Sequence, residues 1–196
     1  MHNKYIPITK QDKGDYIKQS IDYLSLMKRH IRKHHSYMQP IFEAISNAFE
    51  ATNGQGDTIT VRLRLRKVID KLDFQPLEIE DTGIGFNNIN FERLQRLYDE
   101  SKNNNNLGTG RIQYLHFFDK TDIYSVYEED GTKYKRRIVL SANFYPLNKG
   151  VIWASEPEVV DNATRLGTSV AFFYPLDEGD QEYYGNLTSE DIYRVR

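Results

Sequence analysis

The sequence predicts an α+β fold, a two-layer α/β sandwich in which helices cover one face of a mixed, mostly antiparallel sheet. Apolar residues recur at three- and four-residue steps before residue 52, which is typical of helices. Period-two alternation dominates after residue 58 and indicates strands. One further helical stretch near residue 111 separates two groups of strands. The length of 196 residues suits one ordinary domain.

The composition excludes several classes of function. Lys plus Arg is 26 and Asp plus Glu is 28, a net charge of −2, so net charge gives no support for nucleic acid as a partner. The chain has no cysteine, which excludes disulfides, thiol nucleophiles and thiolate-bound metals. It has neither an apolar run of about 20 residues nor an N-terminal signal pattern, so we expect a cytoplasmic protein with no membrane partner.

Residues 1–37 are expected to form an N-terminal helical segment. Lys and Arg separate its apolar residues, as an amphipathic helix requires, and Pro40 is expected to end it. His30 and His34 lie four residues apart, but zinc would need a third ligand that only distant histidines offer, so a solvated basic helix is the prediction. A second helix is expected over 41–52.

Two strands are expected next, over 58–66 and 77–80. The first carries a row of arginines on alternate positions, which we interpret as a solvated sheet face rather than a phosphate site. Residues 86–107 contain one short helical stretch over 91–98 and four consecutive asparagines, so a mobile, lid-like loop is predicted.

The rest of the chain reads as one helix followed by strands. The helix is expected over 111–118 and the last core strand over 167–174. Between them, Glu128 to Gly131 is a hairpin signal. The other expected strands cover 121–128, 133–144 and 151–154, and an acidic, weakly patterned tail is expected over 177–196.

The second helix carries a polar face whose side chains are of the types that bind metal ions. Glu43, Asn47 and Glu50 are spaced by four and three residues and project from one side. Carboxylate and amide oxygens are the ligands that Mg²⁺ accepts alongside substrate phosphates. Taken alone, the segment is better explained by the solvated stripe of an ordinary amphipathic helix.

Two glycine-containing turns follow. In Asp81-Thr82-Gly83-Ile84-Gly85, the glycines permit a close approach to a ligand, and the carboxylate can accept a hydrogen bond from an amino group such as that of adenine. In Leu107-Gly108-Thr109-Gly110-Arg111, backbone N–H groups at a helix N-terminus form a nest for phosphate. Alone, the first would be a tight turn and the second a helix entry turn.

Together and in this order, the three segments resemble the GHKL ATPase superfamily, which includes gyrase B, the ninety-kilodalton heat-shock chaperones, histidine kinases and MutL. MORC-type and uncharacterised bacterial ATP-binding proteins are the nearest members. Leu166-Gly167-Thr168 is similar to a fourth family element. The resemblance spans residues 38–174 and implies a Bergerat fold with an ATP-binding domain over 38–176.

The resemblance implies roles by position. Glu43 would be the general base, Asn47 would hold Mg²⁺, and Asp81 would accept the adenine amino group. Glu50 stands where the family usually has Asp. The other nucleotide-binding positions that it implies are Ala51, Gly83, Ile84, Gly85, Phe86, Lys102, Leu107, Gly108, Thr109, Gly110, Arg111 and Thr168.

The implied activity is Mg²⁺-dependent hydrolysis of ATP, slow in isolation, with nucleotide closing a lid and promoting an ATP-dependent homodimer. The alternatives are a nucleotide-gated binding module without turnover and a phosphotransferase like the histidine or protein kinases; Glu43 favours a hydrolase. Lys102 is interpreted either as a substitute for the lysine that a second domain supplies in hydrolysing relatives or as an exposed loop residue. Arg111 is interpreted as a phosphate contact or a lid anchor.

Overall fold

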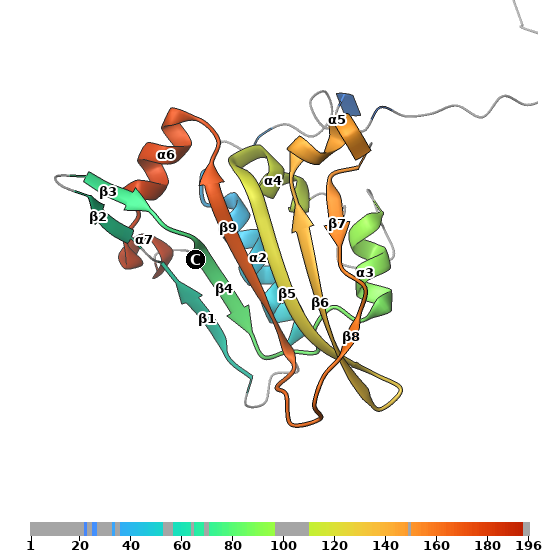
Figure 1. Ribbon diagram of the computed structural model, residues 1–196. Coiled ribbons are helices and arrows are strands. Elements are labelled where there is room, and N and C mark those ends of the chain that lie inside the picture. The colour runs from blue at the N-terminus through green and yellow to red at the C-terminus, as the bar shows by residue number, and fades with distance from the viewer. Residues whose placement is uncertain are drawn as a thin grey trace, which may run out of the picture.

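A seven-stranded antiparallel sheet forms one layer of the computed structural model (Figure 1). The structure describes residues 22, 25, 26, 33, 36–52, 57–63, 65–68, 71–96, 110–148 and 150–193. The strands of the sheet are β1 (Ile59–Arg62), β4 (Leu77–Asp81), β5 (Phe118–Glu129), β6 (Thr132–Leu140), β7 (Ile152–Ala154), β8 (Glu158–Val159) and β9 (Gly167–Pro175). Their order is β1-β4-β9-β5-β6-β7, with β8 beside β6, and every described pairing is antiparallel.

Helices form the second layer, which confirms the predicted α+β sandwich. They are α2 (Gln39–Ala51), α3 (Asn88–Gln95), α4 (Gly110–Phe117), the 3-10 turn η1 (Ala142–Phe144), α5 (Tyr145–Asn148), α6 (Glu178–Gly185) and α7 (Ser189–Tyr193). In Figure 1, α2 and α4 lie behind the sheet, on the same face. None of the described helices is long and apolar enough to cross a membrane.

Helix α2 forms because its apolar residues share one face. Pro40, Ile41, Ala44 and Ala48 are buried at helical spacing. Proline lies in the first turn, where no backbone N–H is needed, so it starts this helix rather than only ending the one before it. The observed helix therefore begins two residues before the predicted one.

The core fills the space between these helices and the sheet. Phe118 lies at its centre, with its ring centroid 4.8 Å from that of Phe172 and 4.7 Å from that of Tyr184. All three side chains are buried. Burying an aromatic side chain of this size contributes about 1.5–3 kcal/mol, so this cluster is a main source of stability.

The alternation along β4 decides which side chains reach the helix layer. Leu77, Ile79 and Asp81 are buried toward the helices. Glu78 and Glu80 point to the opposite, outer face, where Arg62 forms an ion pair with each. Because the side-chain period of a strand is two, this register places the Asp81 carboxylate on the helix side of the sheet.

Two predicted strands were wrong in extent. The strand expected over 58–66 ends at Arg62, and the chain then forms a separate hairpin of β2 (Leu65–Val68) and β3 (Lys71–Phe74). The strand expected over 133–144 ends at Leu140, because the Ser141 side chain accepts the Asn143 N–H and starts η1. The hairpin at residues 128–131 is confirmed, with positive φ at Asp130 and Gly131 as a tight turn requires.

The short helix also begins earlier than predicted, since Asn87 accepts the Asn90 N–H at 2.9 Å and caps α3. Within the acidic, weakly patterned tail expected from residue 177, the structure has the two short helices α6 and α7. Tyr184 in α6 is fully buried in the core cluster. The N-terminal helical segment expected over 1–37 lies mostly outside the described residues.

Candidate functional site

The first predicted segment, on α2, contacts the start of α4. A Cβ atom at Gly110 would lie 1.9 Å from Cδ and Oε1 of Glu43, so the Glu43 carboxylate rests directly against the Gly110 backbone. A larger residue at this position would push the flexible end of the Glu43 side chain aside. Two segments that are 67 residues apart in sequence, with Glu43 at one and Gly110 at the other, are thus brought together by the packing of α2 on α4.

Asn47 completes this cluster together with a residue that sequence reasoning missed. Its Nδ2 donates to Glu43 Oε1 and to the Tyr114 hydroxyl, each at 3.4 Å. Burial and the negative charge of Glu43 raise the pKa of Tyr114, which keeps the phenol neutral. The only signal for Tyr114 was its place one turn after Gly110 on the predicted helix.

The donor set of this cluster fits a magnesium ion with phosphate ligands. Both hydrogen bonds of Asn47 described above are donated by its Nδ2, and its Oδ1 accepts no hydrogen bond from the described residues. Glu43 adds a carboxylate one helical turn away. Two hard oxygens are too few for an all-protein cage, and no group of three or more His, Asp or Glu side chains gathers within the described ranges. Mg²⁺ normally takes such a partial set together with substrate phosphates and water.

The C-terminal end of α2 packs on the second predicted segment. The Ile84 N–H donates to the Ala51 carbonyl at 3.0 Å. A Cβ atom at Gly83 would lie 2.3 Å from that same carbonyl oxygen, so the turn can approach α2 this closely only with glycine there. Glu50, at the same end of the helix, is exposed.

Asp81 is held in a buried, prearranged position at the end of β4. The residue is 6% exposed, and its Oδ1 accepts the Gly83 N–H at 2.9 Å. Burial raises the pKa of Asp81, and the backbone N–H groups of Gly83 and Thr168 oppose this rise without cancelling it. Such a carboxyl is a strong acceptor for a donor that enters the same pocket.

Thr168 lies next to Asp81 and brings in Ser125, which the sequence did not single out. The Thr168 hydroxyl is 3.2 Å from the Ser125 hydroxyl, which also accepts the Phe86 N–H at 2.7 Å. Gly85 and Gly167 both have positive φ, and a Cβ at either would collide with neighbouring backbone. Strand pairing places Ser125 here, and no local motif marks it.

Ile84 and Phe86 flank this end of the site. Ile84 is 40% exposed, whereas Phe86 packs against the second core cluster, which contains Ile112 and Leu115. An exposed isoleucine beside a buried carboxylate offers an apolar surface for a ring that donates to the carboxylate.

Arg111 turns away from the cluster toward α3. Its guanidinium donates to the carbonyls of Arg93 and Arg96 at the C-terminal end of that helix. A cation at the negative end of a helix dipole stabilises the helix, so this contact corresponds to the anchoring alternative. Lys102, Leu107, Gly108 and Thr109 lie outside the described residues.

Comparison with known proteins found no family model that matches the chain and no matching curated protein. Among solved structures, the chain is similar to the 43K ATPase domain of Thermus thermophilus gyrase B in complex with an aminocoumarin, with a TM-score of 0.44 and 20% sequence identity. The match covers 80% of this chain and 38% of that chain. This chain thus corresponds to well under half of the length of that one.

Proposed function

We propose that this protein is an ATP-binding domain of the GHKL type that hydrolyses ATP with magnesium. The observation that carries the proposal is the convergence of three sequence segments on the helix side of the sheet. Glu43 lies against Gly110, and Ala51 lies against Gly83, two residues after the buried Asp81. The Gly83 junction needs glycine because a Cβ there would collide with the Ala51 backbone, and at Gly110 the absence of a side chain leaves space for the Glu43 carboxylate.

The adenine would bind at the Asp81 end. A carboxylate offers about four lone-pair positions, and the backbone N–H groups of Gly83 and Thr168 use two of them. The exocyclic amino group of adenine can donate to a remaining one. The exposed Ile84 side chain would cover the face of the ring, while the Thr168 and Ser125 hydroxyls provide further polar contacts.

The phosphates would bind at the other end, between α2 and the first turn of α4. The N–H groups at this helix N-terminus attract negative charge. Asn47 Oδ1 would coordinate Mg²⁺, which neutralises charge on the phosphates when it is bound. Arrival of phosphates would compete with the Glu43 carboxylate for the space beside Gly110, so we expect Glu43 to rotate toward the attacking water.

In hydrolysis, Glu43 would act as the general base. Its carboxylate takes a proton from water, the water oxygen forms a bond to the γ-phosphorus, and the bond between that phosphorus and the bridging oxygen of ADP breaks. The segment 86–107 would then close over the nucleotide and present a surface to a second copy. The contact of Arg111, on α4, with the C-terminal end of α3 would anchor this segment.

Calorimetry with ATP and Mg²⁺, combined with a phosphate-release assay, tests the proposal. We expect Glu43→Gln to keep its affinity for ATP and to lose about 10²–10⁴-fold in turnover, the usual effect of removing a general base. Glu182→Gln, an exposed glutamate in α6, is the matched control and should hydrolyse ATP at the parent rate. Binding without any turnover in the parent protein would favour the nucleotide-gated module, and transfer of phosphate to protein would favour the kinase-like alternative.

A further inference from the structure

Tyr114 on α4 places a hydroxyl group inside the hydrophobic core. The residue is 4% exposed, and its ring makes an edge-to-face contact with that of Phe172, with the centroids 5.1 Å apart. A phenylalanine would make the same ring contacts, so packing alone does not require the hydroxyl. A buried hydroxyl is destabilising unless it is hydrogen-bonded, and its partner therefore indicates what it does.

Among the described residues, the hydrogen-bond partner of this hydroxyl is Asn47 on α2. Asn47 Nδ2 lies 3.4 Å from the Tyr114 oxygen and 3.4 Å from Glu43 Oε1. An amide nitrogen carries two hydrogens, so these bonds use both and leave Oδ1 on the other branch of the planar group. A flipped amide would bring Oδ1 against the Glu43 carboxylate, where two acceptors repel each other. Glu43 thus decides which way the amide is turned, and Tyr114 fixes its position.

Asn47 needs an anchor because it is an exposed residue. An exposed asparagine populates several staggered rotamers, and only some of them would direct Oδ1 to one point. The Tyr114 ring is enclosed by the core, so its hydroxyl is a fixed point. Glu43, by contrast, is expected to move when phosphates take the space beside Gly110. Tyr114 is then the contact that keeps Asn47 in place.

Tyr114 also joins Asn47 to the helix that would bind the phosphates. It lies about one helical turn after Gly110, on the same helix α4 whose first N–H groups would contact them. A metal ion that bridges a protein oxygen and phosphate oxygens requires both at a set separation. A hydrogen bond between α2 and the rigid side of α4 provides such a separation.

We propose that Tyr114 is a positioning residue of the nucleotide site, whose hydroxyl holds the Asn47 amide so that Oδ1 is available to Mg²⁺. This role of Tyr114 rests on the proposed function. Partners that orient a metal ligand typically contribute about 10–100-fold to metal affinity. Both bonds to Asn47 Nδ2 are long, so we expect the lower end of this range.

Calorimetry with a non-hydrolysable ATP analogue tests this role, because it measures binding without turnover. Each protein is titrated with Mg²⁺ and again with a chelator, and the ratio of the two dissociation constants, the Mg²⁺ ratio, is compared. Tyr114→Phe removes a single oxygen atom and keeps the ring, so the variant remains folded. We expect its Mg²⁺ ratio to fall about tenfold, while its affinity without Mg²⁺ stays within about twofold of that of the parent.

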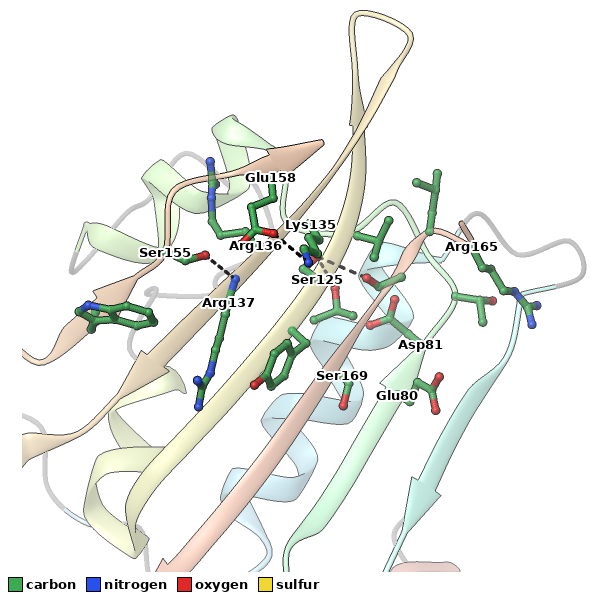
Figure 2. Close-up of a pocket in the computed structure, with 17 residues that line it drawn as sticks. Glu80, Asp81, Ser125, Lys135, Arg136, Arg137, Ser155, Glu158, Arg165 and Ser169 are labelled. Atoms are coloured by element: carbon green, nitrogen blue, oxygen red, sulfur yellow. Dashed lines mark hydrogen bonds and ion pairs between the residues drawn. The ribbon is translucent and has the colours of Figure 1, made fainter. Parts of the chain in front are cut away.

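Two other hydroxyl deletions serve as controls. Tyr184→Phe removes a hydroxyl of the same core cluster, where it donates to the Tyr37 carbonyl, and should keep the Mg²⁺ ratio within about twofold of the parent value. Ser125→Ala removes a hydroxyl at the adenine end of the site, since strand pairing puts Ser125 and Asp81 at one level of the sheet (Figure 2). Ser125→Ala should change affinity by the same factor with and without Mg²⁺.

A double variant separates positioning from a general effect on the fold. Asn47→Ala alone should remove the gain in affinity that Mg²⁺ provides through this residue. Adding Tyr114→Phe should then change the Mg²⁺ ratio by less than about twofold, because the hydroxyl has no amide left to hold. A hydroxyl that acted only on the packing of α2 and α4 would lower the ratio in both backgrounds.

The role of Tyr114 would be overturned by an unchanged Mg²⁺ ratio in Tyr114→Phe, by the same loss in Tyr184→Phe, or by a further loss on top of Asn47→Ala. Each of these results would leave ATP binding by the parent, and with it the proposed function, intact. Failure of the parent to bind the analogue at all would contradict the proposed function itself and the role of Tyr114 with it.

Discussion

Replacing Gly83 by alanine tests how closely α2 lies against the Asp81 turn. The added Cβ would lie 2.3 Å from the Ala51 carbonyl oxygen and 2.5 Å from its carbonyl carbon. Both are backbone atoms at the end of a helix, so a side-chain rotation cannot relieve the collision. The turn must move away from α2, and this lengthens the hydrogen bond from the Ile84 N–H to the same carbonyl.

The expected cost is about 1–3 kcal/mol of unfolding free energy, the usual range for overpacking a buried site. With a urea dependence of about 2–3 kcal/mol/M, the unfolding midpoint should fall by about 0.3–1.5 M urea. Far-ultraviolet circular dichroism across a urea series measures it. The matched control is Gly150→Ala, where the nearest atom lies 3.9 Å away and no positive φ is imposed.

The control should be neutral or stabilising by up to about 1 kcal/mol, because alanine restricts the unfolded chain. The contrast between the two variants isolates the contact from the general effect of adding a methyl group. Equal midpoints for both would refute the close packing of α2 on the turn. The geometry of the candidate site would then need revision, since Asp81 is positioned by the same turn.

Three further variants test the carboxylates and the lid anchor. Asp81→Asn should lower ATP affinity about ten- to a hundredfold in calorimetry, because the amide presents a donor to the adenine amine. Burial also raises the pKa of Asp81 in the folded state, so ionisation of Asp81 destabilises the parent protein as the pH rises above about 4. The unfolding free energy of the variant, compared with that of the parent, should therefore increase with pH. Asp122→Asn should show the opposite pH dependence of stability. Burial acts to raise the pKa of Asp122, but hydrogen bonds from Arg137 and Lys120 outweigh it, so the pKa is lowered in the folded state. The variant should therefore be about 1 kcal/mol less stable than the parent at neutral pH and equally stable in strong acid. Urea titrations at several pH values check both predictions. If the stabilities of the two variants changed with pH in the same direction, the opposite pKa shifts of Asp81 and Asp122 would be contradicted. Arg111→Gln should speed hydrogen exchange in α3 without changing exchange in α2, and unchanged exchange in α3 would show that the arginine does not anchor it.

Local patterns predicted the elements that have strong local signals. The alternation before Asp81 identified β4, and Glu128 to Gly131 identified the hairpin, because side-chain period and turn chemistry act within a few residues. The end of β1 at Arg62 was not predicted, because the alternation continues past it. Only pairing with other strands decides where a strand leaves the sheet. The burial of Tyr184 was not predicted either, because the residues around it in the sequence are mostly acidic and give no pattern of a buried face.

The candidate site divides in the same way. Glu43, Asn47 and Asp81 were predicted because glycine turns and helical spacing are visible in sequence. Tyr114 and Ser125 were not predicted, since their place in the site depends on helix packing and strand register, which join residues far apart in the chain.

Hydrogen exchange measured by mass spectrometry, with and without a non-hydrolysable ATP analogue and Mg²⁺, tests the central claim most directly. The proposed site predicts slower exchange in α2, in residues 81–86 and in the first turn of α4, because these segments would contact the nucleotide. It predicts no change in β7 and β8, which lie toward the other edge of the sheet. Protection confined to β7 and β8, or none at a saturating concentration of the analogue, would contradict a nucleotide site between α2, the Asp81 turn and α4.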